Sequence, residues 1–461
     1  MQVSRYIIFV AMLVSIGMLR RRGPQEAFLK VWIPFFLFMP FVFWVNIPGL
    51  PDPNFMQAAI LPILFILLRD YLPSMRLGRM EWLLLLYVLI RVSADYLSRG
   101  YSDAQNYAFY MASSLIGPYL IGACLINSRR MDIETARSFV LAFLLLFPTF
   151  LYEAKMWVSP SYALFSGFFP NAFSGLSVRW GMARTAGTFE HPILACIMII
   201  AVYRLHCWLA WQGVWEQKQA GILGLIQKLA GFLPLAFRHQ ISLALVLMAL
   251  MTISRGPWIG ALAGAALVAV GNTKKRRQWL VILLAAFVLG GACGQAALNA
   301  YITPAEGEIL TGEAQTMLYR KVMIEQYKAF LMERMWTGWG LTTVPTIKGM
   351  ESIDNAFFLM ALQHGVLAPA VFAFIFLYAI VSQIGFGLKA APGEAPLGFT
   401  FSGIYLMCFG SFMTVYMGAQ TEPMLFLLLG WGEGIKRRAE AGLVQPGTPV
   451  AVAAAFRRVI V

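Results

Sequence analysis

Long apolar runs constrain this chain more than any other feature. A helix needs about 20 mostly apolar residues, within a range of about 17–25, to cross the hydrocarbon core of a bilayer. Only 13% of the 461 residues are charged and 59% are hydrophobic, whereas a soluble domain has about 25% charged residues. We therefore predict an all-α fold, a polytopic transmembrane helix bundle of about 12–13 spans. The apolar runs place these spans at 6–19, 29–47, 54–69, 80–98, 107–127, 136–158, 191–211, 239–254, 257–271, 278–298, 355–385, 398–417 and 420–435.

The Lys and Arg residues predict the orientation of this bundle. Cytoplasmic loops of membrane proteins hold an excess of Lys and Arg. With the N-terminus outside, the inside segments hold two thirds of the 36 basic residues, and the C-terminus is cytoplasmic. Basic cytoplasmic loops explain the net charge of +14 better than nucleic-acid binding does. The run 6–19 also fits a signal peptide, although its basic residues follow the apolar stretch instead of preceding it.

The chain divides into three parts. Residues 1–158 are N-terminal transmembrane helices, residues 159–435 form the region where chemistry is expected, and 436–461 are a cytoplasmic tail. The middle part includes a long outside loop, 299–354, in which 311–336 has the pattern of an amphipathic helix. One face of that helix is apolar and the other is charged. The apolar face holds Tyr319, Met323, Tyr327 and Phe330, and the charged face holds Lys321, Glu325 and Lys328.

An inside segment, 212–238, also carries one apolar stripe, which predicts a helix lying in the membrane interface. The stripe consists of Trp215, Ile222, Ile226, Leu229 and Leu233. Metal chemistry has little support in the sequence, because the five Cys residues form no CxxC pair and only four His residues occur. We expect no metal and no cofactor.

The first segment that could carry chemistry is RWGMARTAGTFEHPILA, residues 179–195. It places two cations, Arg179 and Arg184, close to the membrane boundary, and Glu190 and His191 follow them just before an expected span. Proline is favoured in the first turn of a helix. His191 and Pro192 therefore have a second interpretation, as a helix start without a catalytic role.

The second segment is TISRGPWIG, residues 252–260, a short outside turn whose one charge is Arg255. A guanidinium at this boundary needs an anionic partner or water. Because guanidinium groups bind phosphate oxygens in pairs, Arg255 could clamp a phosphate or pyrophosphate. Alternatively, its side chain extends to the lipid headgroups.

The third segment is residues 338–366, in which a Gly-rich loop with Trp339 leads into an apolar helix through Asp354 and Asn355. Asp354 could be a carboxylate poised at the membrane surface, or Asp354 and Asn355 could simply cap the helix. His364 lies ten residues further on and is expected inside the membrane, as a functional group or as a satisfied buried histidine.

The three segments together favour transfer from a lipid-linked pyrophosphate. Arginines would bind the pyrophosphate and stabilise the charge on the leaving group. A carboxylate or imidazole would take the proton from the attacking hydroxyl, and no metal is needed.

At these segments the sequence resembles the O-antigen ligase and polysaccharide polymerase family of membrane glycosyltransferases. The matching stretches are RTAGTFEHPILA, SRGPWIG, YRKVMIEQYKAFLMERMWTGWG and DNAFFLMALQHGV, and their order matches too. The resemblance covers roughly residues 180–370, and it implies joining of undecaprenyl-pyrophosphate-linked glycans outside the cytoplasmic membrane of a bacterium. The expected partners are the lipid-linked donor, a glycan or lipid-linked acceptor, membrane lipid and a protein that regulates chain length.

The resemblance also implies site residues. Arg184 and Arg255, with Arg179, would bind the pyrophosphate, and Asn355, Trp339 and His364 would support the site. Ligase-type members usually have a His-Asn pair where this chain has Asp354 and Asn355. The proton acceptor is then Asp354, or else His191 or Glu190.

That departure favours a repeat-unit polymerase of an exopolysaccharide or O-antigen over a ligase. Two other classes stay open. A polysaccharide flippase or transporter would carry more polar groups near mid-membrane. A metal-dependent lipid-sugar transferase would show an acidic early outside loop, where this chain has only Asp52.

Overall fold

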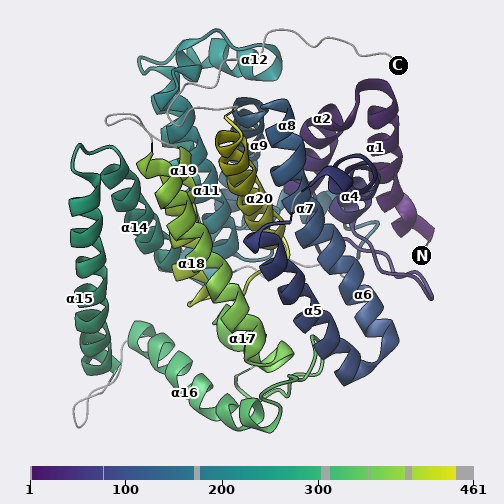
Figure 1. The fold of residues 1–461 in the computed structure, drawn as a ribbon, viewed down its shortest axis with the longest axis vertical. Helices are drawn as coiled ribbons and strands as arrows, with labels where there is room; N and C mark the ends of the chain where they lie inside the picture. The colour runs from purple at the N-terminus through teal and green to yellow at the C-terminus, as the bar shows by residue number, and fades with distance from the viewer. Residues whose placement is uncertain are drawn as a thin grey trace.

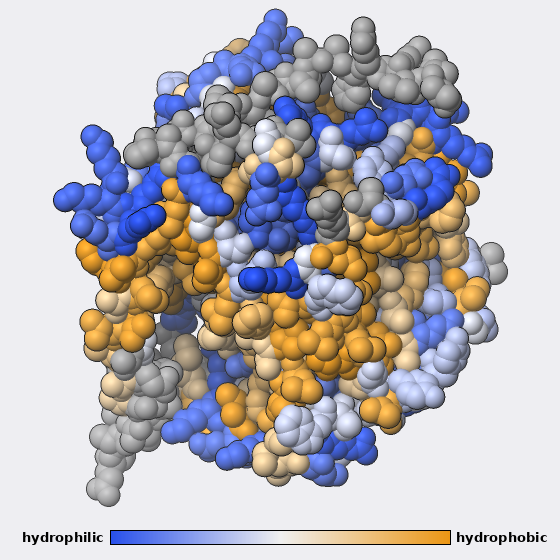
Figure 2. All heavy atoms as spheres, viewed as in Figure 1, coloured by the Kyte–Doolittle hydropathy of each residue, from blue (hydrophilic) through white to orange (hydrophobic). Residues whose placement is uncertain are grey.

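The computed structural model describes residues 3–75, 77–170, 177–302, 312–350, 352–389 and 397–442. These residues form a bundle of helices with one two-stranded hairpin, which confirms the predicted all-α membrane fold (Figure 1). The amphipathic helix α16 (Gly312–Glu333) lies at one end of the bundle and α12 (Gly221–Ala230) lies at the other (Figure 1). Apolar side chains form a broad belt between these two polar ends (Figure 2).

The N-terminal helices run up to residue 165. Their bounds are α1 (Phe9–Arg22), α2 (Pro24–Ala27), α3 (Ile33–Phe38), α4 (Phe55–Ile66), α5 (Arg79–Arg99), α6 (Tyr101–Met111), α7 (Gly117–Leu120), α8 (Asn127–Arg129), α9 (Asp132–Met156) and α10 (Pro160–Phe165). Two short π-helical stretches connect α6, α7 and α8 into one continuous helix over Tyr101–Arg129.

The C-terminal half begins with the hairpin strands β1 (Ser177–Arg179) and β2 (Met182–Arg184). Its further helices are α11 (Pro192–Trp211), α13 (Phe237–Met251), α14 (Arg255–Gly271), α15 (Arg276–Ile302), α17 (Ala356–His364), α18 (Leu367–Leu388), α19 (Leu397–Phe412) and α20 (Thr421–Glu440).

Among the described residues, four helices are both long and apolar enough to cross a membrane. They are Tyr101–Arg129, Asp132–Met156, Pro192–Trp211 and Leu367–Leu388. Four shorter apolar helices accompany them, at Gly221–Ala230, Phe237–Met251, Arg255–Gly271 and Leu397–Phe412. The chain is therefore a multi-pass membrane protein, and the number of crossings stays a prediction.

Small residues let the central helices approach closely. Every residue of α20 from 421 to 435 is buried, and a Cβ on Gly430 would overlap the carbonyl of Tyr119. In the same way, a Cβ on Gly264 of α14 would overlap the carbonyl of Gly403 of α19. Interfaces between membrane helices are enriched in such residues because backbones can then pack directly.

Three predicted spans are wrong in their bounds. The run 29–47 extends too far, because the helical stretch ends with α3 at Phe38. The run 355–385 is split at Gly365, whose φ of 79° ends α17 before α18 begins, and the Val366 N–H bonds to the Met335 carbonyl. The run 398–417 extends too far, because α19 ends at Phe412. In all three cases hydropathy stays high past the end of a helix, so composition cannot reveal where the helix ends.

The two amphipathic predictions have different outcomes. On α16, Met323 and Tyr327 are buried against Leu362, and Lys321, Glu325 and Lys328 are exposed, as predicted. In the other segment Ile222, Leu229 and Leu233 are exposed, but Trp215 is buried and packs against Phe237. Trp215 therefore belongs to the core and not to the interfacial stripe.

Candidate functional site

A tight turn folds residues 177–184 into a hairpin that presents two arginines on one face. Trp180 and Gly181 have φ values of 54° and 72°, and two successive positive φ values are typical of two-residue hairpin turns. Arg179 pairs with Met182 across the hairpin, and Arg184 pairs with Ser177. Because side chains alternate along a strand, Arg179 and Arg184 lie on the same face.

That face meets the turn between α13 and α14. The Arg184 guanidinium donates from Nε to the Thr252 carbonyl at 3.2 Å and from Nη2 to Ser254 Oγ at 3.1 Å. A third bond joins its Nη1 to Ser177 Oγ at 3.1 Å, so at most two of its five N–H groups are left for a ligand. Burial, followed by the charge of Arg179, lowers the pKa of Arg184 to about 10, and the side chain stays cationic at neutral pH.

The same turn has a strained backbone. Ile253 has a φ of 48°, a conformation that β-branched residues rarely adopt and that costs about 1–3 kcal/mol. Arg179 donates to the Ile253 carbonyl at 3.1 Å, so the hairpin holds the turn in this shape.

Arg255 completes a set of three arginines at this turn. It is the first residue of α14, where the helix dipole adds partial positive charge, and its guanidinium lies 5.4 Å from the centre of the Trp180 ring. Arg179, Arg184 and Arg255 therefore gather around residues 252–255, and a site with this charge favours anions.

Glu153 of α9 holds the loop between the hairpin and α11 in place. Its carboxylate accepts the N–H groups of Ala186 at 2.9 Å and Gly187 at 2.7 Å. Gly187 has a φ of 63°, and a Cβ there would overlap the Phe150 ring, so only glycine fits. This packing accounts for the small residues in the motif RTAGTFEHP.

His191 is the N-cap of α11, as the alternative interpretation of this residue predicted. Its Nδ1 accepts the N–H of Ile193 at 3.1 Å, so in the neutral imidazole the proton is on Nε2, which can donate but not accept. Burial, followed by the positive charge of Arg184, lowers the pKa of His191 to about 4. The charge of Asp354 opposes this shift, so His191 lies within electrostatic reach of both groups.

Glu190 lies beside His191 and is half-buried. Burial raises the pKa of its carboxyl to about 7, against an opposing hydrogen bond from the Ala419 N–H. Glu190 also packs closely against Gly418, because a Cβ on Gly418 would lie 3.2 Å from Glu190 Oε2. A carboxyl with this pKa can exchange a proton near neutral pH.

The loop between α19 and α20, residues 413–420, brings the three predicted segments together. The Tyr416 ring stands edge-on to the His191 ring, with centroids 6.3 Å apart. The Val415 carbonyl accepts the Ala356 N–H at 3.0 Å, and a Cβ on Gly256 would lie only 3.0 Å from Thr414 Oγ1. This loop is therefore in contact with the starts of α11, α14 and α17.

Asp354 lies where α16 approaches this loop. Its carboxylate accepts a hydrogen bond from Ser352 Oγ at 2.6 Å and lies 3.9 Å from Arg320 Nη2. Arg320 of α16 also donates to the Thr414 carbonyl at 3.2 Å. The helix cap is Asn355, whose Oδ1 accepts the Phe358 N–H at 3.0 Å, so Asp354 does not have that role.

Trp339 holds the loop between α16 and α17 against both of these helices. Its backbone N–H donates to the Leu362 carbonyl at 2.8 Å, and its Nε1 donates to the Phe330 carbonyl at 3.0 Å. The Arg334 guanidinium lies 4.3 Å from the centre of its ring.

His364 belongs to a different, buried cluster. Its ring stacks on Tyr107 at 5.2 Å, and its Nε2 lies 3.3 Å from the Tyr107 hydroxyl. The Tyr107 ring in turn lies 5.2 Å below the guanidinium of Arg91, which pairs with Glu422 at 2.9 Å. Tyr110 also donates to Glu422. In the part of the chain that the structure describes, the His364 ring contacts Tyr107 and not Arg179, Arg184 or Arg255, so His364 belongs to this cluster and not to the arginine site.

Sequence analysis did not anticipate Arg320, Tyr416 or the Arg91–Glu422 pair. Arg91 and Glu422 are charges within predicted spans, and this unusual position is the signal that could have found them. Tyr416 gives no such signal, because it stands in an apolar run.

The fold and the site define a multi-pass helical membrane protein with a cationic site built at the ends of its helices. Residues 240–373 match the family model described as O-antigen ligase. The resemblance noted above is thus confirmed for residues 240–373, which make up less than half of the chain. No curated protein matches the chain.

The matched region runs from α13 to α18 and contains Arg255 and Asp354, whereas Arg184 and His191 precede it. In general terms, the match indicates an enzyme that transfers glycosyl groups, with lipid-linked glycans as substrates in a membrane. The donor, the acceptor and the residues that act on them are matters of proposal.

Proposed function

We propose that this protein joins undecaprenyl-pyrophosphate-linked glycans on the extracytoplasmic face of the bacterial inner membrane, as a repeat-unit polymerase. The observation that carries the proposal is the gathering of Arg179, Arg184 and Arg255 around residues 252–255, next to Glu190 and His191. Three cations at one turn match the charge of a pyrophosphate.

The arginines have different roles in this scheme. Arg255 and Arg179 bind the donor pyrophosphate, because Arg255 stands at a helix N-terminus and Arg179 is bonded to the turn beside it. Arg184 positions the turn through its two bonds to Thr252 and Ser254, and it adds positive charge to the site. Together they stabilise the negative charge that grows on the leaving pyrophosphate, without a metal.

The acceptor hydroxyl supplies the nucleophile. Its oxygen bonds to the anomeric carbon of the donor sugar, the bond from that carbon to the pyrophosphate oxygen breaks, and the electron pair leaves with the pyrophosphate. Asp354 takes the proton of the hydroxyl. His191 donates from Nε2 to an oxygen of the reacting groups, since its Nδ1 is already an acceptor for Ile193. Glu190 is the alternative proton acceptor, with a pKa of about 7.

A polymerase is favoured over a ligase by the residue at position 354. Ligase-type members usually carry a histidine there, whereas this chain has an aspartate that is bonded to Ser352 and lies near Arg320. A ligase that attaches finished polymer to a separate acceptor is the alternative within the family.

Purified protein in detergent, incubated with a lipid-linked oligosaccharide repeat, tests the proposal. We expect products longer by whole repeats from the natural chain and none from R255A. The variant R22A, which removes an exposed arginine on α1, should behave as the natural chain. No lengthening by the natural chain would overturn the polymerase assignment.

Gene deletion with analysis of the glycans then separates polymerase from ligase. Loss of long polymer with single repeat units remaining supports a polymerase. Polymer that is still made but stays on its lipid carrier contradicts the polymerase and points to a ligase.

A further inference from the structure

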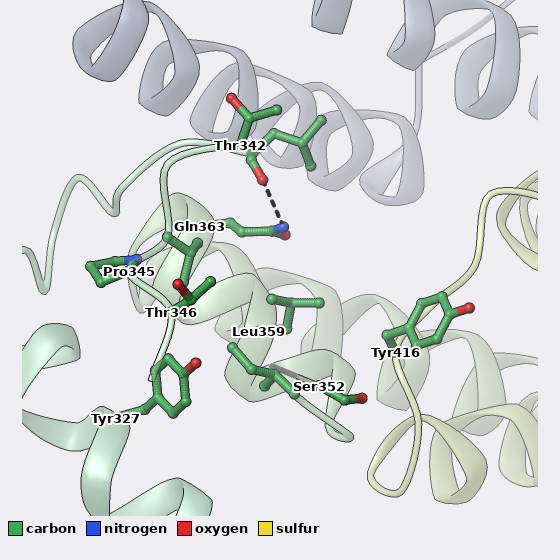
Figure 3. A pocket seen from close by; sticks show the side chains of 11 residues that line it. Tyr327, Thr342, Pro345, Thr346, Ser352, Leu359, Gln363 and Tyr416 are labelled. Atoms are coloured by element: carbon green, nitrogen blue, oxygen red, sulfur yellow. Dashed lines mark hydrogen bonds between the residues drawn. The ribbon is translucent and has the colours of Figure 1, made fainter. Parts of the chain in front are cut away.

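A cavity of about 280 Å³ lies beside the Asp354 side of the site (Figure 3). Its walls are the loop 341–346, residues 352 and 353, α17, Tyr327 of α16 and Tyr416. Drug-sized ligands occupy pockets of about 300–1,000 Å³, so this cavity suits a single small ring and not several.

The lining of the cavity mixes polar and apolar side chains and, among the described residues, it is uncharged. Hydroxyl and amide groups come from Thr342, Thr346, Ser352 and Gln363, and a tyrosine stands at each of two sides, Tyr327 and Tyr416 (Figure 3). Leu359 and Val344 add apolar surface. Neutral sugars present hydroxyl groups around an apolar C–H face, so they match hydroxyls, amides and aromatic rings better than charged groups.

The cavity is preformed because its walls are held by backbone bonds. The Gly340 N–H donates to the Gln363 carbonyl at 2.8 Å, and the Leu341 N–H donates to Asp95 Oδ1 at 2.6 Å. Gln363 Nε2 returns a bond to the Leu341 carbonyl at 3.3 Å (Figure 3). A wall that is already in place lowers the entropy cost of binding.

The position of the cavity connects it to the two candidate catalytic groups. Ser352 lines the cavity, and its hydroxyl donates a hydrogen bond to Asp354 at 2.6 Å. The lone pairs of the Ser352 oxygen can therefore accept a hydrogen bond from a hydroxyl group of a bound ring. Tyr416 lines the same cavity and contacts the His191 ring. A ring bound here would therefore lie next to Ser352 and Tyr416, the residues that contact Asp354 and His191.

The turn that carries Arg255 meets the same loop at Thr414. Gly256, next to Arg255, faces Thr414, whereas Tyr416 faces both His191 and the cavity. A donor held by Arg255 and a ring bound in the cavity would thus both adjoin loop 413–420, one at Thr414 and the other at Tyr416.

We propose that this cavity is the subsite for the terminal sugar of the acceptor glycan, and that it selects a neutral pyranose ring. This assignment rests on the proposed transferase function. Recognition comes from the polar groups of Thr346, Ser352 and Gln363 and from the faces of the two tyrosine rings.

Direct binding of sugars tests the subsite separately from catalysis. Saturation-transfer NMR on the purified full chain would use the methyl glycosides of glucose, galactose, mannose and N-acetylglucosamine as probes, with methyl glucuronide as the charged comparison. We expect a signal for at least one neutral glycoside and a weaker one for the glucuronide. T346W, which fills the cavity, should reduce the signal at least fivefold, and R255A should leave it unchanged.

Two further variants keep the test informative. T346V keeps the volume of the side chain and removes one hydroxyl, so it should weaken binding even if T346W fails to fold. K321A, on the exposed face of α16, is the matched control and should bind as the natural chain does. Equal signals from the natural chain and a folded T346W, or no signal with any neutral glycoside, would overturn the subsite.

Kinetics then connect the subsite to the acceptor. T346V should raise the KM for the acceptor at least threefold while kcat and the KM for the lipid-linked donor stay the same. A rise in the donor KM instead would overturn the acceptor assignment. Sugar binding that T346W blocks supports the subsite whether or not the chain lengthens glycans, so the two proposals fail separately.

Discussion

The guanidinium of Arg184 donates to the carbonyl of Thr252 at 3.2 Å and thereby fixes the hairpin on the turn before α14. Lysine has one ammonium group and cannot reach Thr252, Ser254 and Ser177 in the same fork-like geometry. R184K should therefore lose at least 90% of the transferase activity and lower the free energy of unfolding by about 1–3 kcal/mol. Activity and thermal unfolding in detergent measure the two effects, and natural activity in R184K would show that charge alone suffices.

Arg255 should behave differently from Arg184. Arg255 is half-buried, and one of its contacts is a cation–π interaction with Trp180 at 5.4 Å, which is worth about 0.5–2 kcal/mol. R255A should thus abolish polymer formation while the Tm changes by only a few degrees. R255K, which keeps the charge, should retain a small part of the activity. A polymer yield like that of the natural chain from R255A would rule out the pyrophosphate role.

Glu190 and His191 should affect stability in opposite directions as the pH changes. Burial raises the pKa of Glu190 to about 7, above its unfolded value of about 4.3, so its contribution is present below pH 4 and is lost as the pH rises to 7. The pKa of His191 is lowered to about 4, below its unfolded value of about 6.5, so its contribution is present above pH 6.5 and is lost as the pH falls to 4.

In the natural chain, the contributions of Glu190 and His191 to stability nearly cancel between about pH 4.5 and 6.5, the range that both pKa shifts span. E190Q removes one of them, so its Tm should rise with pH across this window. H191N keeps a capping side chain and removes the imidazole, so its Tm should fall with pH. Thermal unfolding at several pH values measures both variants. Parallel profiles for the natural chain, E190Q and H191N would contradict the two shifts.

Much of the fold could be predicted because hydropathy and helical periodicity are local properties. The apolar runs predicted the bundle, and the spacing of Tyr319, Met323, Tyr327 and Phe330 predicted the buried face of α16. The break at Gly365 could not be predicted from hydropathy, since residues on both sides are apolar and the signal is a backbone angle.

The site was predictable in part for a related reason. Arg184, Arg255 and Asp354 stand out because charges are rare next to apolar runs. Arg320 looks like any charge on an amphipathic helix, and its bond to Thr414 joins residues 94 positions apart. Such contacts depend on the packing of loop 413–420, which no short motif encodes.

Asp354 and its neighbour Asn355 separate catalysis from capping. Asn355 caps α17 by accepting the Phe358 N–H, so N355A should lower the free energy of unfolding by about 1 kcal/mol. N355D should keep the natural stability, because Asp caps a helix as well as Asn does. D354N keeps the size of the side chain and removes the proton acceptor, so it should slow transfer by about 100-fold or more at an unchanged Tm. Initial rates at saturating donor and acceptor, with N355D as the control, measure this effect. If D354N retains most of the natural rate while E190Q loses it, Glu190 is the proton acceptor and the role assigned to Asp354 is wrong.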